Sequence, residues 1–269
     1  MTNTTTTTTT IPAVSAPAAP GSRAQRLMTH AALAAGAVLM VGCATGPEGN
    51  PRDPFERFNR GVTTFNDNVD QAVLKPVATV YRDVTPSFAR TGVNNFFANL
   101  GDAWSFVNNV LQLRGEAALE SLVRFNVNTF FGLGGVLDIA SEMNVDRHRQ
   151  DFGLTLGRWG VPTGPYLVLP LLGPSTVRDT AALPVDNYGN LLSHVDPVSA
   201  RNSLYALRIV DTRAKLLGAG SVLESAALDK YTFTRDAYLQ YRSQQGATGR
   251  LNEEESYDSG AGQLPREDE

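Results

Sequence analysis

Residues 53–69 read DPFERFNRGVTTFNDNV, and this stretch predicts the first helix of a folded body. Asp53 followed by Pro54 is typical of a helix start, because an N-cap aspartate accepts hydrogen bonds from free N–H groups and proline fits the first turn. Apolar residues then recur at spacings of three and four, which places them on one face of a helix. The members of this stripe are Phe55, Phe58, Val62, Phe65 and Val69.

The segment before this helix is typical of an export signal. Residues 2–22 are rich in Thr, Ala and Pro, so we expect them to be disordered. Arg23 and Arg26 then precede an apolar stretch, residues 31–42, that ends at Cys43. Positive charge, a short apolar core and small residues are the layout of a secretory signal, and this core is too short to span a bilayer.

The residues around Cys43 resemble a bacterial lipobox, since residues 39–43 read LMVGC. The resemblance implies cleavage before Cys43 and attachment of lipid to it. Ala44 stands where Asp would signal retention in the inner membrane, so the outer membrane is the expected destination. An ordinary signal peptide with a chance cysteine is the alternative. Cleavage would take the formal charge from −4 to −6, so bulk attraction to anionic lipid is not expected.

Further helices are predicted along the rest of the chain. Pro76 and Pro86 bracket a short segment around residues 77–81. Apolar periodicity and turn residues predict the other elements. They are a helix capped by Ser87 whose pattern continues to residue 113, a helix over 116–131 ending at Gly132, a short helix within 136–143, a helix starting near Ser175, Arg178 and Asp179, a helix over 202–217, and shorter helices up to residue 243. Strand signals are weak, so the fold class is mainly α.

The segment 151–174 differs from its surroundings because it is rich in Gly and Pro. Within it, residues 166–172 read YLVLPLL, an apolar run that Pro170 interrupts. A long helix is therefore impossible, and the run is too short to cross a bilayer. We expect a loop that is buried in the protein or dips into the membrane.

The sequence contains few residues suited to catalysis or metal binding. After Cys43 the only histidines are His148 and His194, both in polar segments where a surface role is expected, and neither has metal-ligand spacing. No G-x-S-x-G elbow occurs, and no basic block supports nucleic-acid binding. The glycines of residues 132–135 follow a predicted helix rather than a strand, which excludes a nucleotide loop. We expect no enzyme activity, no catalytic residue, no metal, no cofactor and no nucleic acid partner.

Several short motifs resemble, in order, those of the MlaA (VacJ) family of outer-membrane lipoproteins. The stretch DPFERFNR at residues 53–60 resembles the opening motif of that family. The other matching motifs are Lys75-Pro76-Val77-Ala78, Val93-Asn94-Asn95-Phe96 with Asn99-Leu100, Arg124-Phe125 with Asn128-Thr129, residues 132–138, residues 151–157, Trp159-Gly160-Val161, Gly164-Pro165-Tyr166, Leu169-Pro170 and Arg178-Asp179. The similarity covers about residues 53–243.

This resemblance implies a single ring-like helical domain with amphipathic helices embedded in one membrane leaflet. It implies an amphipathic channel that removes misplaced phospholipids from the outer leaflet of the outer membrane and passes them to a periplasmic lipid carrier. It also implies association with an outer-membrane porin trimer. A lipid crosses a bilayer slowly because its polar head group must enter hydrocarbon, and a polar channel lining removes that cost.

Four segments are expected along the chain. They are a signal peptide with a Thr-rich extension at 1–42, a lipidated tether at 43–52, the helical domain at 53–243 and a disordered acidic tail at 244–269. The lipid-anchor residue is Cys43. The candidate channel or gate residues are Phe152, Gly153, Gly157, Trp159, Gly164, Pro165, Tyr166 and Pro170. The candidate membrane-proximal helix contributes Phe55, Phe58, Asn59, Val62, Phe65 and Asn66.

Two other classes of function stay open at this point. A structural or surface-adhesion lipoprotein involved in intercellular spreading would share the anchor and the helices, but it would carry no bound lipid. A membrane-associated hydrolase would need a dispersed catalytic triad, which the scarcity of histidine disfavours.

Overall fold

The computed structural model describes residues 50–219 and 229–260, with the side chains of 50–219 and 229–246. The expected signal peptide, Cys43 and most of the tether lie outside these residues, as does the end of the expected acidic tail. The expectation of a mainly helical body is confirmed, since helices make up most of the described chain.

The body begins with three helical segments that follow one another without a break: α2 (Glu56–Val69), the π-helix η1 (Asp70–Leu74) and α3 (Lys75–Val84). Pro76 lies in the first turn of α3, where proline is tolerated. The helix around residues 77–81 is therefore longer than expected, and it continues from α2 rather than standing apart.

Asp53 does not cap α2, which corrects the expectation from its Asp-Pro start. The helix begins at Glu56, and Phe55 holds the N-cap position without a side-chain hydrogen bond. Asp53 is instead buried, and it is bonded by side chains from two helices. The donors are Asn59 of α2 and Tyr231 and Arg235 of the last helix.

Two long helices lie side by side in the middle of the chain, α4 (Ser87–Leu111) and α5 (Gly115–Phe130), and the short α6 (Ile139–Glu142) follows them. Pro86 rather than Ser87 is the N-cap residue of α4, so the predicted serine cap is wrong. The turn after α5 contains Gly132, where an added Cβ would lie 2.2 Å from the carbonyl oxygen of Leu137. Only glycine fits such a close backbone approach.

The Gly- and Pro-rich segment forms a short helix and a β-hairpin, not a loop. The elements are α7 (Phe152–Arg158), β1 (Tyr166–Leu169) and β2 (Gly173–Thr176), and α8 (Val177–Gly189) comes next. The strands pair antiparallel, with Tyr166 opposite Thr176. Tyr166 and Val168 are buried, whereas Leu171 and Leu172 at the tip are 66% and 70% exposed. The apolar run is therefore half core strand and half exposed hairpin tip.

The last part of the chain consists of η2 (Leu191–His194), α9 (Val198–Lys215) and α11 (Lys230–Gly260). The helix α9 confirms the prediction for 202–217 and begins four residues earlier. The N-cap of α8 is Thr176 instead of Ser175. Within the described residues from 229 onward, the one helix α11 takes the place of shorter helices expected up to residue 243. It passes through the boundary at which the acidic tail was expected to begin.

One face of α11 attaches this helix to the rest of the body at two points. Four side chains at helical spacing form that face, and they act as two pairs. Each pair is a tyrosine and an arginine four residues apart that bind one aspartate: Tyr231 with Arg235 on Asp53, and Tyr238 with Arg242 on Asp179. Tyr166, Val168 and Tyr231 form the apolar core cluster beneath this face, with Val62, Tyr238 and Leu239 around them.

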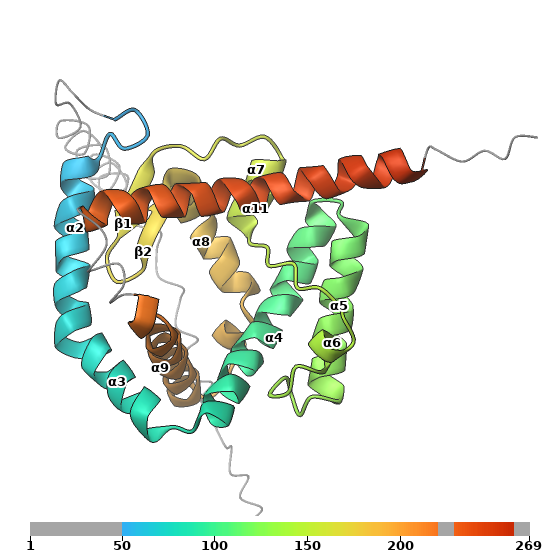
Figure 1. Ribbon diagram of the computed structural model, residues 1–269, viewed down its shortest axis with the longest axis horizontal. Helices are drawn as coiled ribbons and strands as arrows, with labels where there is room; N and C mark the ends of the chain where they lie inside the picture. The colour runs from blue at the N-terminus through green and yellow to red at the C-terminus, as the bar shows by residue number, and fades with distance from the viewer. Residues whose placement is uncertain (1–49, 220–228, 261–269) are drawn as a thin grey trace, which may run out of the picture. The chain divides into compact units, whose positions relative to one another are not determined.

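The packed pairs of elements form a closed circuit. Along this circuit α2 packs on β1, α3 packs on α9, α9 packs on α4, α4 packs on α7, and α7 packs on α11, which also contacts β2. Figure 1 shows α9 between α3 and α4, with α11 crossing the hairpin and α7. Residues of α4, α8, α9 and the hairpin tip meet around one hollow.

Candidate functional site

A cavity of about 660 Å³ with both polar and apolar walls lies at this place, and we call it the mixed cavity. Its walls come from α4, α8, α9, the loop before α7 and the hairpin tip, segments that are far apart in sequence. The lining residues are Ala98, Leu100, Gly101, Asp102, Trp104, Ser105, Arg149, Gln150, Asp151, Leu172, Leu183, Asp186, Asn187, Asn190 and Arg208.

The three carboxylates of the mixed cavity are each held by neighbouring groups. Asp102 accepts an ion pair from Arg147 at 3.1 Å. Asp151 receives two bonds from Arg242, at 2.6 and 3.0 Å. Asp186 accepts hydrogen bonds at 2.8 Å from the Trp104 indole and from the Phe152 backbone, and burial raises its pKa despite these donors.

The Trp104 ring packs against a glycine of α8. A Cβ added to Gly189 would lie 2.2 Å from two carbons of the Trp104 ring. The indole therefore packs closely against Gly189 of α8 while its N–H donates to Asp186. This contact fixes an aromatic wall of the mixed cavity between α4 and α8.

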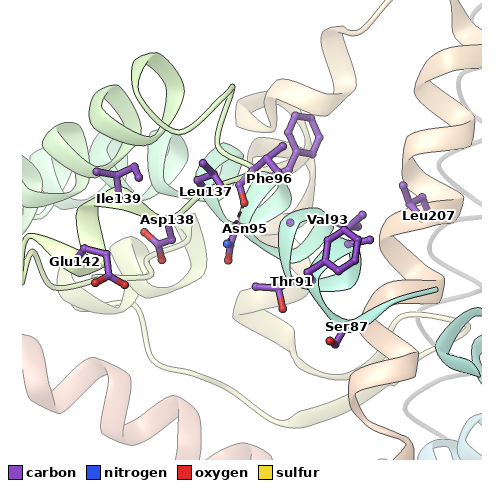
Figure 2. A pocket seen from close by; sticks show the side chains of 14 residues that line it. Ser87, Thr91, Val93, Asn95, Phe96, Leu137, Asp138, Ile139, Glu142 and Leu207 are labelled. Carbon is purple, nitrogen blue, oxygen red and sulfur yellow. Dashed lines mark hydrogen bonds between the residues drawn. The ribbon is translucent and has the colours of Figure 1, made fainter.

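A second hollow, the apolar groove, has a volume of about 870 Å³ and opens between the start of α4, residues 136–142 and α9. Figure 2 shows Leu207 of α9 across this groove from Leu137 and Ile139. Phe88 of α4 also lines it and is 78% exposed. Asp138 and Glu142 are the acidic residues of its wall.

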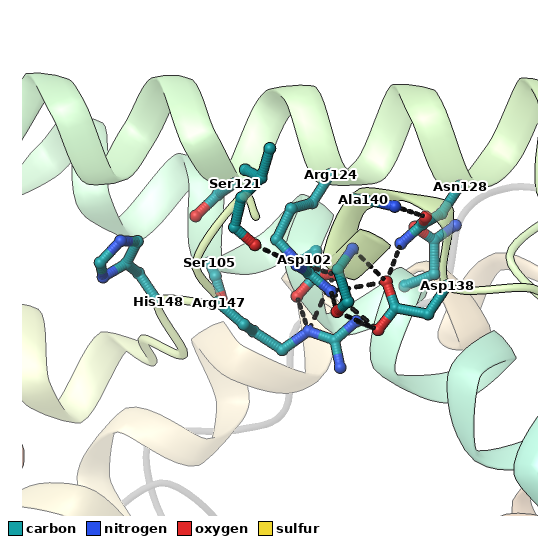
Figure 3. A network of polar contacts seen from close by, with 12 residues as sticks. Asp102, Ser105, Ser121, Arg124, Asn128, Asp138, Ala140, Arg147 and His148 are labelled. Carbon is teal, nitrogen blue, oxygen red and sulfur yellow. Dashed lines mark hydrogen bonds and ion pairs between the residues drawn. The ribbon is translucent and has the colours of Figure 1, made fainter. Parts of the chain in front are cut away.

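A buried ionic cluster joins α4 to α5 and to the residues around α6 (Figure 3), and its Asp102 also lines the mixed cavity. Arg124 of α5 is 1% exposed and donates to both carboxylate oxygens of Asp138, at 2.7 and 2.9 Å. Arg147 bridges Asp138 and Asp102. The cluster therefore holds two positive and two negative groups, which offsets the cost of burying each charge.

The pKa values of the two aspartates in this cluster are shifted in opposite directions. Burial raises the pKa of Asp102 and outweighs the opposing charges of Arg147 and Arg124. Burial also acts on Asp138, but hydrogen bonds from Ser141 and Asn128 and the arginine charges outweigh it, so its pKa lies below the usual value. The cluster is well suited to fixing the spacing of α4, α5 and α6.

The candidate gate residues divide between packing positions and surface. Tyr166 belongs to the core, and Phe152 and Trp159 form an edge contact at 5.9 Å. Gly153 packs against Asp179, where an added Cβ would lie 2.5 Å from a carboxylate oxygen. Pro170 is exposed at the hairpin tip.

The remaining gate candidates lie near the hairpin and α7. Gly164 has a φ of 70°, and the carbonyl of Pro165 accepts the Val177 amide. Gly157 lines a polar cleft of about 290 Å³ beside α11. Within the described ranges, none of the eight candidates lines the mixed cavity; from segment 151–174 only Asp151 and Leu172 do.

The candidate residues of α2 fall on two faces. Phe58 and Phe65 are 37% and 50% exposed, and Phe55 and Val62 are half-buried. Asn59 is fully buried, and both Asn59 and Asn66 bind strand β1. The asparagines are therefore structural contacts of the hairpin.

A stripe of exposed valines runs along η1 and α3, beyond the helix that the sequence indicated. The four side chains are spaced by four, three and four residues and are between 47% and 75% exposed. They are Val73, Val77, Val80 and Val84. An apolar row of this length on one exposed helix face is typical of an interaction surface.

The histidines have local partners. His148 contacts Glu120 and is partly buried rather than exposed as expected, whereas His194 lies at the surface against Tyr188. Across residues 50–219 and 229–260, no group of three or more His, Cys, Asp or Glu residues is arranged to hold a metal ion. Within those same ranges, no helix combines the length and apolarity needed to cross a membrane.

Sequence reasoning missed most residues of the mixed cavity. No local pattern marks Trp104, Leu183, Arg149 or Arg208 as site residues. Their shared wall depends on long-range packing, which periodicity does not encode. The apolar run at residues 166–172 was a local signal for Leu172, which lines the cavity.

Comparisons with known proteins agree with this fold. A family model described as MlaA lipoprotein matches residues 51–245. The chain is 39% identical over 217 residues to the intermembrane phospholipid transport system lipoprotein MlaA of Escherichia coli, which covers 78% of this chain and 85% of that protein. It is 34% identical over 218 residues to the protein of the same name from Haemophilus influenzae, covering 76% and 84%.

A solved structure reported as the structural basis for maintenance of bacterial outer membrane lipid asymmetry is also similar. It superposes with a TM-score of 0.64 at 35% identity and covers 72% of this chain and 98% of that one. The family match spans every element from α2 to α9 and enters α11. The resemblance of the sequence motifs is therefore confirmed, and the chain belongs to the MlaA lipoprotein family.

Proposed function

We propose that this chain is an outer-membrane lipoprotein that removes misplaced phospholipids from the outer leaflet and passes them onward through the mixed cavity. Its relatives in Escherichia coli and Haemophilus influenzae are named as lipoproteins of an intermembrane phospholipid transport system. The action is transfer rather than catalysis, because the lipid needs only a path for its head group. The chain thereby maintains the asymmetry of the outer membrane.

The observation that carries this proposal is the composition of the mixed cavity. Leu100, Leu172 and Leu183 give it apolar surface, while Asn187 and Arg208 give it polar surface. A phospholipid has the same two characters. A cavity that offers both kinds of contact lowers the cost of taking a head group out of water without a bilayer crossing.

The valine stripe supports a position inside one leaflet of the membrane. Exposed apolar side chains of η1 and α3 are stabilised when lipid tails replace water around them. Phe130, Phe131 and Leu133 at the end of α5 are also about three-quarters exposed. We propose that these surfaces contact acyl chains of the periplasmic-side leaflet and that lipid on Cys43 anchors the chain there.

The proposal includes two protein partners and a moving part. A porin trimer would hold the chain in the membrane, and a periplasmic carrier would accept the lipid; both follow from the family resemblance. Segment 151–174 remains the proposed channel wall or gate, because Asp151 and Leu172 of that segment line the mixed cavity. An engineered cross-link that locks the hairpin tip to α8 should then stop lipid transfer.

Filling the mixed cavity tests the proposal. Gly101 lines the cavity and has no atom within 4 Å of an added Cβ, so Gly101→Trp places a large ring there without a clash at the backbone. Gly61 of α2 is equally open and lies outside the cavity walls, so Gly61→Trp is the matched control. Both full-length variants are expressed in cells that lack the native protein.

The measurement is phospholipid at the cell surface, labelled with an amine-reactive reagent that does not cross membranes. We expect Gly61→Trp to restore a low surface level and Gly101→Trp to leave it high at equal protein abundance. Normal clearance by Gly101→Trp would contradict transfer through this cavity. Release of lysophospholipid or fatty acid by the purified protein would indicate hydrolysis instead.

A further inference from the structure

Two arginines of the mixed cavity stand out because neither forms a hydrogen bond or an ion pair within the described segments. Arg149 lies in the loop between α6 and α7, and Arg208 lies on α9. The two residues are far apart in sequence and line the same hollow from different walls. Both residues are exposed to solvent, and both line the cavity.

Among the described residues, the carboxylates of the same cavity form no hydrogen bond or ion pair with these two arginines. Asp102 pairs with Arg147 and Arg124, and Asp151 pairs with Arg242. Asp186 accepts its hydrogen bonds from uncharged donors. Each carboxylate thus has a hydrogen-bonding or ion-pairing partner other than Arg149 or Arg208. Arg149 acts on Asp102 through its charge, which opposes the rise in the pKa of that carboxyl. The N–H donors of both guanidinium groups therefore stay available to an anion.

The chemistry of these groups specifies the kind of anion. A guanidinium group presents paired N–H donors whose geometry matches the oxygens of phosphate or carboxylate. Trp104, Leu172 and Leu183 provide apolar walls within the same cavity. A ligand that satisfies both sets of contacts carries an anionic group next to an apolar body.

We propose that Arg149 and Arg208 bind the phosphate of a phospholipid head group inside the mixed cavity. This inference rests on the proposed function and names the two side chains that recognise the cargo. The phosphodiester is common to all glycerophospholipids, so the pair selects phospholipid against lipids of similar tails without a phosphate, and it does not distinguish one head group from another.

The test compares two lipids with identical tails and one fluorescent label, phosphatidylglycerol and diacylglycerol, bound to the full-length protein in detergent. The variants are Arg149→Gln, Arg208→Gln and their combination. Because each charge-assisted contact contributes at least about a tenfold change in affinity, we expect the double variant to weaken phosphatidylglycerol binding by about 100-fold or more. Its affinity for diacylglycerol should stay within about twofold.

Two further variants separate recognition of phosphate from loss of charge or of fold. Arg57→Gln removes one charge from the exposed side of α2 and should leave both affinities unchanged. Replacing both arginines by lysine keeps the charge but loses the paired donors, so it should give an intermediate affinity for phosphatidylglycerol. An equal loss for both lipids in the double glutamine variant would overturn the proposal, as would no loss for either.

Inorganic phosphate distinguishes a lipid site from a site for free phosphate. We expect it to compete only weakly with phosphatidylglycerol. Binding of phosphate that phosphatidylglycerol fails to displace would overturn the assignment to a head group. If Gly101→Trp blocks surface clearance while the double glutamine variant binds both lipids normally, this inference fails alone. If the protein binds neither lipid and clears none, the proposed function fails.

Discussion

Asn59 and Asn66 lie seven residues apart on α2, and both side chains bind the free edge of strand β1. Each amide donates to one strand carbonyl and accepts one hairpin N–H, from the strand for Asn59 and from the hairpin tip for Asn66, much as a neighbouring strand would. The four bonds are Asn59 Nδ2 to Tyr166 O at 3.1 Å, Val168 N to Asn59 Oδ1 at 2.8 Å, Asn66 Nδ2 to Leu169 O at 3.0 Å and Leu171 N to Asn66 Oδ1 at 2.7 Å. The helix α2 thus takes the place of a third strand.

Removing these amides should loosen the hairpin. Asn59→Ala leaves the buried Val168 N–H and a buried carbonyl without partners, so we expect a loss of about 2–4 kcal/mol in the free energy of unfolding. Asn66→Ala lies nearer the surface and should cost about 1 kcal/mol. Urea denaturation followed by circular dichroism measures both. Asn68→Ala, at an exposed position of the same helix, is the control and should change stability by less than about 0.5 kcal/mol.

The attachment of α11 through Arg242 should be sensitive to the loss of that side chain. Arg242 is nearly buried and bonds both Asp151 and Asp179, so Arg242→Met leaves Asp151 without its cation and leaves Asp179 paired with Arg178. We expect a loss of about 3 kcal/mol and faster hydrogen–deuterium exchange in residues 230–246.

The control for this prediction is an exposed ion pair of the same kind. Arg82 pairs with Asp83 at 2.9 Å, and both side chains are more than 40% exposed. Arg82→Met should therefore cost less than about 1 kcal/mol and leave exchange in α11 unchanged. Equal effects of the two arginine substitutions would show that Arg242 does not attach α11.

The hairpin, unlike the helices, could not be predicted from the sequence. The stripe from Phe55 to Val69 was predictable because its period of three and four is local. The strand β1 has four residues, too few for alternation to be distinguished from an apolar run, and its edge is paired by asparagines of α2. Nothing in the sequence around residue 166 indicates that distant partner.

The mixed cavity was unpredictable for a related reason. Arg149 and Arg208 are 59 positions apart, and each alone is typical of a solvated surface. Asp53 shows the same limit, because an Asp-Pro start is a good capping signal until a long-range partner such as Arg235 takes the carboxylate. Local patterns therefore predicted the helices, whereas the site depends on contacts made only in the folded chain.

Alkaline pH should destabilise the protein through its buried tyrosines. Burial, with a smaller contribution from the Asp53 charge, raises the pKa of Tyr166 to about 12, and burial also raises the pKa of Tyr231 and Tyr238. In the unfolded chain these phenols lose their protons near pH 10. Unfolding above pH 10 therefore releases protons. The stabilisation that comes from these protonated tyrosines is complete below pH 10 and is lost as the pH rises through 12.

Denaturation midpoints measured between pH 8 and 12 test this sign. We expect the contribution of the buried tyrosines to the free energy of unfolding to be constant up to about pH 10 and to decline above it. Tyr166→Phe keeps the ring and removes one ionisable group, so its midpoint should fall less steeply above pH 10. An identical slope in the variant would mean that Tyr166 does not carry the effect.

Gly189 should be required for the position of Trp104. An added methyl group would lie 2.2 Å from two ring carbons, and the indole is rigid, so Gly189→Ala must displace the ring from α8. The bond from Trp104 to Asp186 at 2.8 Å would then break. We expect a loss of about 1–3 kcal/mol from overpacking and weaker clearance of surface phospholipid, because Trp104 lines the mixed cavity.

Trp104 fluorescence reports this displacement directly in a Trp159→Phe background, since the chain has two tryptophans. Emission should shift to longer wavelength in Gly189→Ala, because the ring moves away from α8 and becomes more exposed to water. Gly61→Ala is the matched control: its Cβ meets no atom within 4 Å, and alanine favours a helix interior by up to about 1 kcal/mol. Unchanged emission in Gly189→Ala would mean that the ring does not depend on this glycine, and the loss of clearance would then need another cause.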